Sequence, residues 1–198
     1  MNEVDHSQFW EDIYLEDDAG WDLGGVTPVF DNIADKFTEA LVEEAKKVKL
    51  GDPFDKGTDV GPMSSKMQFS STINKVDLAK KEGARVLTGG KKSDLFEKGY
   101  FYEPTVFDQV TPNMEIIMEE AFSPVIPVQR VKSLDEAIAM SNSTRYGLAC
   151  TIFTRDIERA LTAEDNIQAG TFCINSPLME NMAAPFGGMK QSGNGREH

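Results

Sequence analysis

Two adjacent carboxylates stand out in the stretch IMEEAFSPV, which runs from Ile117 to Val125. Glu119 and Glu120 lie among apolar residues, where a carboxylate needs hydrogen-bond partners or a ligand. Neighbouring residues of an extended segment point to opposite sides, so at most one of the two faces a given pocket. A glycosidase-type acid and base must instead face each other. The spacing argues against a catalytic dyad and leaves two readings open, a ligand-holding element and an ordinary solvated loop.

The cysteines and histidines offer little further chemistry. Cys150 in LACTIFT and Cys173 in GTFCIN each lie in an apolar run typical of a strand. We interpret both as small buried hydrophobes, because free cysteine is among the most buried residue types. The chain has only two histidines, His6 and His198. We therefore expect no metal site and no histidine-based triad.

Glycine clusters are the remaining candidates for phosphate binding. The segment GGMKQSGNG (187–195) matches neither of the two common nucleotide-binding fingerprints. Gly89 and Gly90 follow a predicted strand but open no helix. We interpret both clusters as turns.

The elements that must position these residues alternate along the chain. Hydrophobic periodicity and stop signals predict helices at about 31–48, 64–82, 134–143 and 156–168. They predict strands at 84–90, 104–110, 125–131, 148–154 and 171–175. We expect Asp31 to cap the first helix and Glu43 to pair with Lys47. This alternation predicts an α/β fold with a mostly parallel sheet and flanking helices.

Composition limits the function classes. The chain has 198 residues, a formal net charge of −13 and 40% hydrophobic residues. The negative charge argues against nucleic acid as a partner. No apolar run is long enough for a membrane span, so we expect no membrane partner. The start of the chain has no signal-peptide pattern, and we expect a cytoplasmic protein.

Six segments, in order, resemble the C-terminal part of the aldehyde dehydrogenase catalytic domain. They are GDPFDKGTDVGP (51–62), GYFYEPTVF (99–107), MEEAFSPV (118–125), YGLACTIFT (146–154), AGTFCIN (169–175) and PFGGMKQSGNGRE (185–197). The resemblance covers about residues 31–198 and implies a truncated form of that α/β domain. In this family a cysteine thiolate attacks an aldehyde, hydride passes to NAD or NADP, and a thioester is hydrolysed to the acid.

The resemblance assigns roles to four residues. Glu120 matches the glutamate that binds the nicotinamide ribose, and Phe122 matches the aromatic residue that packs against the nicotinamide. Gln68 matches a residue near the adenosine ribose, and Phe186 matches a position that lines the aldehyde tunnel. The family implies no metal. Ser123 replaces the usual glycine of this loop, and we expect it to stiffen the turn beneath the nicotinamide.

The family's nucleophile has no counterpart at the matching position. Counted back from the first helix, it falls near Trp21, and no cysteine lies nearby. The cofactor-binding domain and the general-base glutamate precede the matched region in the family. We therefore expect this chain to be inactive alone, with dinucleotide binding weak or lost. Exposed apolar surface would then lead to self-association.

Residues 1–30 resemble a different family. FWEDIY and WDLGGVTPVF are similar to the N-terminal motif of thiopurine-type or thiol-type S-adenosylmethionine methyltransferases. Residues 1–20 hold seven acidic residues and no lysine or arginine. The resemblance implies a join near Phe30 between segment 1–30 and fragment 31–198. We interpret the aromatic residues of this segment, Phe9, Trp10, Tyr14 and Trp21, as a patch over exposed apolar surface.

Two alternatives to an inactive fragment remain. The chain could retain NAD(P)-dependent aldehyde oxidation if another polypeptide supplied the missing parts. It could also be a non-catalytic binding module whose acidic, aromatic N-terminal segment recruits a partner.

Overall fold

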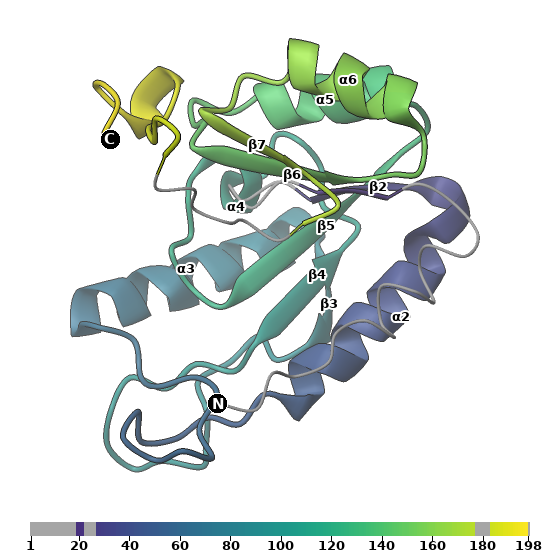
Figure 1. Ribbon diagram of the computed structural model, residues 1–198. Coiled ribbons are helices and arrows are strands. Elements are labelled where there is room, and N and C mark those ends of the chain that lie inside the picture. The colour runs from purple at the N-terminus through teal and green to yellow at the C-terminus, as the bar shows by residue number, and fades with distance from the viewer. Residues whose placement is uncertain (1–18, 22–26, 177–182, 198) are drawn as a thin grey trace. The chain divides into compact units, whose positions relative to one another are not determined.

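The computed structural model describes residues 19–21, 27–176 and 183–197 (Figure 1). The chain forms two compact units. Unit 1 contains the described residues up to Phe37 and those from Arg130 onward, and unit 2 contains Thr38–Gln129. Helix α2 (Asp31–Lys47) and strand β5 (Val125–Val131) pass from one unit into the other.

Unit 1 is built on a three-stranded sheet in the order β1-β6-β7. Strand β6 (Ala149–Phe153) pairs antiparallel with β1 (Ala19–Trp21) and parallel with β7 (Thr171–Ile174). Helices α5 (Leu134–Asn142) and α6 (Ile157–Asn166) lie together on one side of this sheet (Figure 1). Strand β2 (Thr27–Phe30) contacts α5 and β1, and the short helix η1 (Lys190–Ser192) lies near the C-terminus.

The apolar positions of α6 and the neighbouring strands form the core of unit 1. Ile152, Ala160 and Ala163 are buried together. The partly buried side chains of Leu134, Ile167 and Phe172 pack against them.

Unit 2 contains the strands β3 (Arg85–Thr88) and β4 (Thr105–Asp108). Strand β4 pairs antiparallel with β3 and parallel with β5. Helix α3 (Lys66–Glu82) packs against the short helix α4 (Glu115–Met118). The largest fully buried apolar side chains of the unit include Phe107, Ile116 and Val76.

The described strands therefore form both parallel and antiparallel pairs, and helices flank them. This confirms the α/β class that the alternation of strands and helices predicted, with a mixed pattern of pairing. Among the described residues, no helix is both long and apolar enough to cross a bilayer.

Local sequence explains where most helices begin and end. The side chains of Ser65, Ser133 and Asp156 accept hydrogen bonds from backbone N–H groups in the first turns of α3, α5 and α6. These caps satisfy donors that a helix cannot satisfy internally. Helix α3 ends at Gly83, whose φ of 104° is a left-handed conformation that glycine adopts without strain.

Two expectations for α2 are wrong in detail. Asp31 is the first residue of the helix and lies in its first turn, rather than preceding it as a cap. Glu43 pairs with Lys46 at 3.0 Å, and Glu44 pairs with Lys47. Residues three apart are neighbours on a helix just as residues four apart are, so both spacings allow an ion pair.

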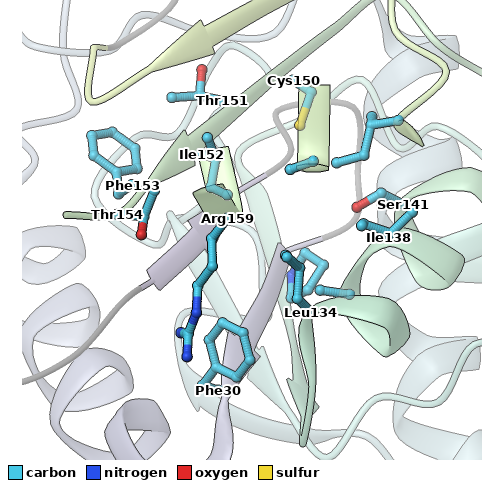
Figure 2. A pocket seen from close by; sticks show the side chains of 14 residues that line it. Phe30, Leu134, Ile138, Ser141, Cys150, Thr151, Ile152, Phe153, Thr154 and Arg159 are labelled. Carbon is cyan, nitrogen blue, oxygen red and sulfur yellow. The ribbon is translucent and has the colours of Figure 1, made fainter. Parts of the chain in front are cut away.

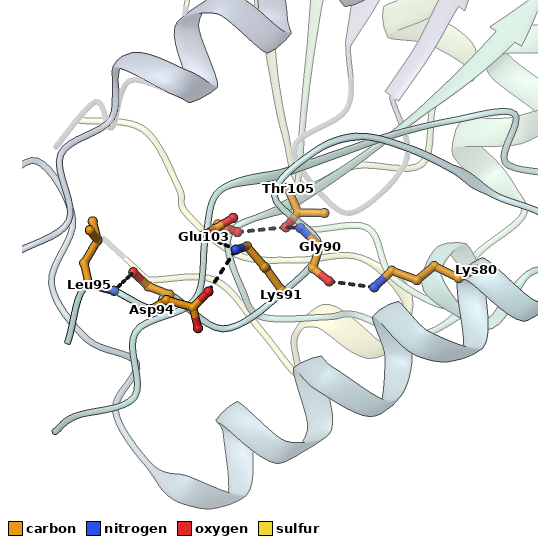
Figure 3. A network of polar contacts seen from close by, with 8 residues as sticks. Lys80, Gly90, Lys91, Asp94, Leu95, Glu103 and Thr105 are labelled. Atoms are coloured by element: carbon orange, nitrogen blue, oxygen red, sulfur yellow. Dashed lines mark hydrogen bonds and ion pairs between the residues drawn. The ribbon is translucent and has the colours of Figure 1, made fainter. Parts of the chain in front are cut away.

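The Gly89–Gly90 pair forms a turn, as predicted. Both glycines have positive φ values, of 68° and 75°. The backbone N–H of Gly90 donates to Thr105 Oγ1 at 2.8 Å, and Lys80 Nζ donates to the Gly90 carbonyl at 2.6 Å (Figure 3). The amide is thus engaged within the protein, which favours a turn over a phosphate site.

Candidate functional site

The Glu119–Phe122 loop connects α4 to β5 in unit 2. Glu119 is the C-cap of α4, with an extended backbone (φ −119°, ψ 124°). Its side chain is half-buried, whereas that of Glu120 is exposed. Two successive residues in an extended segment project to opposite sides, so these carboxylates do not form a facing pair. Of the two carboxylates, that of Glu120 is the more exposed.

Phe122 has an unusual conformation within this loop. Its φ is 48°, a left-handed value that is uncommon for a bulky residue. The residue is 76% exposed, so it contributes little to the core of unit 2. Backbone strain of this kind clusters at active sites and ligand-binding loops, which makes this loop the candidate site.

Helix α3 holds the loop through two side chains. Gln68 Nε2 donates to the carbonyl oxygens of Ala121 at 2.8 Å and Phe122 at 2.9 Å. Lys75 Nζ donates to the carbonyl oxygen of Glu120 at 2.5 Å and makes a longer contact, 3.5 Å, with that of Glu119. The structure thus brings Gln68 next to Glu120 and Phe122. Sequence reasoning missed Lys75, because nothing in its local sequence marks it as different from the other lysines of the helix.

Ser123 continues the loop towards β5. The carbonyl oxygen of Ser123 accepts a hydrogen bond from the backbone N–H of Val125 at 2.7 Å. Its hydroxyl is buried and finds no hydrogen-bond partner among the described residues. Burial of this hydroxyl without a hydrogen-bond partner therefore lowers the stability of the folded protein.

Phe186 belongs to unit 1, whereas the other three predicted site residues belong to unit 2. It forms an isolated antiparallel bridge with Glu197, with backbone hydrogen bonds of 2.9 Å and 2.7 Å. Its side chain is half-buried. The glycines that follow allow close backbone packing, since a Cβ on Gly188 would meet Ser192. The glycine-rich tail is thus a packed turn, as its sequence indicated.

The two cysteines lie on neighbouring strands but on opposite faces of the sheet. Thr151 is paired in register with Cys173, and Cys150 with Phe172. Register partners of a parallel pair share a face, so Cys150 and Cys173 face apart, and neither forms a disulfide. Cys150 is 2% exposed and lines a cavity of about 20 Å³ beside α5 and α6 (Figure 2). That volume has room for about one water molecule and none for a substrate.

A larger cavity of about 590 Å³ lies in unit 2, between the C-terminal end of α2 and the turn after β3. Its lining includes Lys46, Lys47, Lys49, Leu95 and Glu103. None of the predicted site residues lines it, so the candidate site remains the Glu119–Phe122 loop.

Three predictions fall wholly or partly outside the described residues: the expected absence of a metal site, the position matched to the nucleophile, and the resemblance to a methyltransferase. The described part of the chain contains no group of histidine, cysteine, aspartate or glutamate residues able to hold a metal ion. The position that matches the family nucleophile falls near Trp21, whose side chain is not among the described parts of the structure. The same holds for His6, His198 and most of the segment that resembles a methyltransferase. That resemblance stays a prediction.

Comparison with known proteins gives a consistent family match. The sequence profile of the aldehyde dehydrogenase family matches residues 26–198. Aldehyde dehydrogenase, cytosolic 1, from Rattus norvegicus is 44% identical over 169 residues, which are 85% of this chain and 33% of that protein. Aldehyde dehydrogenase, cytosolic 2, from Macroscelides proboscideus is also 44% identical, over 85% of this chain and 70% of that protein.

A solved structure supports the same match. Betaine aldehyde dehydrogenase from Staphylococcus aureus, in complex with NAD+, superposes with a TM-score of 0.84 and 39% identity. The match covers 87% of this chain and 35% of that protein. The present chain thus spans about a third of the length of this structure and of the rat relative.

Proposed function

Because the chain belongs to the aldehyde dehydrogenase family, we propose that its residues form part of a catalytic domain that oxidises an aldehyde to a carboxylate. The observation that carries this proposal is the family match over residues 26–198. NAD or NADP, when bound, supplies the hydride acceptor. An NAD+ complex of a relative with a TM-score of 0.84 supports this choice of cofactor.

We assign the nicotinamide end of the cofactor to the Glu119–Phe122 loop. The exposed carboxylate of Glu120 can accept hydrogen bonds from both hydroxyls of a ribose, since a carboxylate has several acceptor positions. The exposed ring of Phe122 offers a flat apolar surface for the nicotinamide. The carboxylate of Glu120 and the ring of Phe122 together fit a nucleoside, whose ribose is polar and whose base is planar.

We propose that Gln68 both supports the Glu119–Phe122 loop and contacts the cofactor. Its side-chain nitrogen already donates to two carbonyl oxygens of the loop. A direct contact with the cofactor would therefore use the side-chain oxygen, Oε1, which can accept from a ribose hydroxyl. Phe186 is proposed to line the path of the aldehyde, where an aromatic wall favours an apolar substrate over water.

We further propose that the 198-residue polypeptide does not oxidise aldehydes by itself. Acyl transfer through a thioester needs an accessible thiolate. Cys150 is 2% exposed, and Cys173 is half-buried on the middle of a strand. Neither occupies the sequence position that matches the family nucleophile, which falls near Trp21.

The test is to express the 198-residue polypeptide and to measure NADH and NADPH formation with a panel of aldehydes. We expect no turnover. Turnover that is abolished by Cys150→Ser or Cys173→Ser would overturn the proposal of inactivity and support an enzyme. Turnover that appears only after addition of a second polypeptide would favour completion by a partner chain.

Exposed apolar side chains favour self-association. In unit 2, Phe54 is 96% exposed, Leu95 is 81% exposed and Met67 is 80% exposed. Such side chains are stabilised when a second copy covers them. Light scattering across a concentration series tests this, and a monomer at the highest concentration would contradict it. The triple change of Phe54, Leu95 and Met67 to serine should shift the distribution towards monomer.

The binding-module alternative rests on the acidic segment 1–18. Strands β1 and β2 belong to unit 1, and Val29 of β2 is fully buried, so a deletion of residues 1–30 would damage the fold. Deletion of residues 1–18 is the sharper test. Loss of partner binding with an unchanged thermal transition would favour a binding module, whereas aggregation would favour an apolar patch.

A further inference from the structure

Four consecutive carbonyl oxygens of the Glu119–Phe122 loop are bound by two side chains of one helix. Lys75 contacts the first two carbonyls, and Gln68 contacts the last two. All these groups lie within unit 2. The contacts join residues more than 40 positions apart in the sequence, so they are features of the fold and not of the local chain.

Helix geometry explains why two side chains can cover the whole loop. Gln68 and Lys75 are seven residues apart, which places them about two turns apart on the same side of α3, a rise of about 10.5 Å. The two donors are therefore far enough apart along the helix for each to meet its own pair of carbonyls.

The conformation of the loop needs this support. Phe122 has a φ of 48° and is 76% exposed, so packing of its side chain contributes little to holding the strained backbone. A strained residue persists only where its surroundings fix it. The charged donor of Lys75 is the stronger of the two, because hydrogen bonds from an ionised group are shorter and stronger than neutral ones.

Lys75 also leaves the functional groups of the loop available. Its Nζ atom donates to the main-chain oxygen of Glu120 and not to the side-chain carboxylate. The carboxylate of Glu120 is exposed and can still accept from a ligand. Lys75 thus fixes the loop without occupying its binding groups.

We infer that Lys75 is a positioning residue, which acts with Gln68 to hold the Glu119–Phe122 loop so that Glu120 and Phe122 present a carboxylate and an aromatic face to a nicotinamide nucleotide. The ligand part of this inference rests on the proposed function above. The loop-holding part depends only on the contacts of unit 2.

The first experiment measures the loop directly in the full 198-residue chain. Chymotrypsin cleaves after exposed phenylalanines, and Phe54 and Phe122 are both exposed in loops of unit 2. The ratio of cleavage after Phe122 to cleavage after Phe54 reports on the Glu119–Phe122 loop. General destabilisation of the protein raises both rates and leaves the ratio unchanged, whereas opening of this loop raises only the first. In the original chain the charged hydrogen bond of Lys75 opposes local opening of the loop. Lys75→Met removes this bond, so we expect the cleavage ratio to rise about tenfold.

Two further variants make the result specific. Lys75→Arg keeps a charged donor and should restore the ratio to near the original value. Lys81→Met removes an exposed lysine from the last turn of the same helix and should leave the ratio unchanged. An unchanged ratio in Lys75→Met would overturn the inference.

The second experiment tests the ligand. Saturation-transfer NMR with NAD+ compares the signals of the nicotinamide and adenine protons. We expect Lys75→Met to lower the nicotinamide signal relative to the adenine signal by at least threefold, with recovery in Lys75→Arg. An unchanged signal ratio would overturn the positioning role even if cleavage had changed. If the original chain gave no signal at all, the ligand part of the inference would fail for this chain, and the cleavage ratio would still decide whether Lys75 holds the loop.

Discussion

Gln129 gives the most quantitative prediction, because its amide is buried without compensation. The residue lies in β5 and is 1% exposed. Neither Nε2 nor Oε1 finds a hydrogen-bond partner among the described residues. Pro127 and Val131, which lie on the same face of the strand as Gln129, are also buried, so this face is apolar. We expect Gln129→Met to stabilise the protein.

The magnitude follows from the two unpaired groups. Burying an amide without a hydrogen bond costs about 1–3 kcal/mol in protein mutational series. Methionine is similar in length, unbranched and flexible, so it can fill the same space without overpacking. We therefore expect the free energy of unfolding to rise by about 2 kcal/mol, which for a chain of this size raises Tm by about 4–8 °C.

The assay is urea and thermal unfolding followed by far-UV circular dichroism. Gln168→Met serves as the matched control, because that side chain is exposed and its replacement should change stability by less than about 0.5 kcal/mol. A neutral or destabilising result for Gln129→Met, with a neutral control, would refute the reasoning. It would mean that the amide makes a favourable interaction, such as with a buried water.

Three further predictions concern unit 2. Ser123→Ala should raise the free energy of unfolding by about 1 kcal/mol in urea titrations, because it removes a buried hydroxyl that lacks a partner. Arg85→Met should lower it by about 1–2 kcal/mol, since the guanidinium pairs at 2.8 Å with the buried carboxylate of Asp108 but is itself half exposed. Burial, with smaller contributions from two nearby carboxylates, raises the pKa of Tyr102. The unfolded phenol ionises above about pH 10 and the folded one does not, so stability should fall above that pH, and Tyr102→Phe should lessen the fall in pH-dependent unfolding curves.

Most of the fold could be predicted because its signals are local. Apolar periodicity and the stop at Gly83 place α3 within two residues of its observed bounds. Ser133 and Asp156 begin α5 and α6 where their side chains can cap them. The ion pairs of α2 could not be predicted in detail, because spacings of three and four residues are both compatible with a helix.

Some features of the candidate site could likewise be predicted from the sequence, and others could not. The motif around Glu120 and Phe122 is contiguous, so a family resemblance can identify it. The support from Gln68 and Lys75 comes from residues separated from the loop by 44 to 54 positions, and no local pattern reports such a contact. The strain at Phe122 is equally hidden, because a positive φ is expected from sequence mainly at glycine, asparagine and aspartate.

The adjacent carboxylates show how the fold separates two chemically identical residues. Helix α4 ends at Glu119, whose backbone is already extended. This change of geometry leaves Glu119 half-buried and Glu120 exposed. Lys75 binds the carbonyl oxygens of both residues, and by the inference above it holds the loop in this geometry. A glycosidase-type dyad needs two carboxylates that face each other across the scissile bond, whereas adjacent residues of an extended segment point to opposite sides. The difference between the two acids therefore comes from the end of a helix and from one lysine, and not from the chemistry of glutamate.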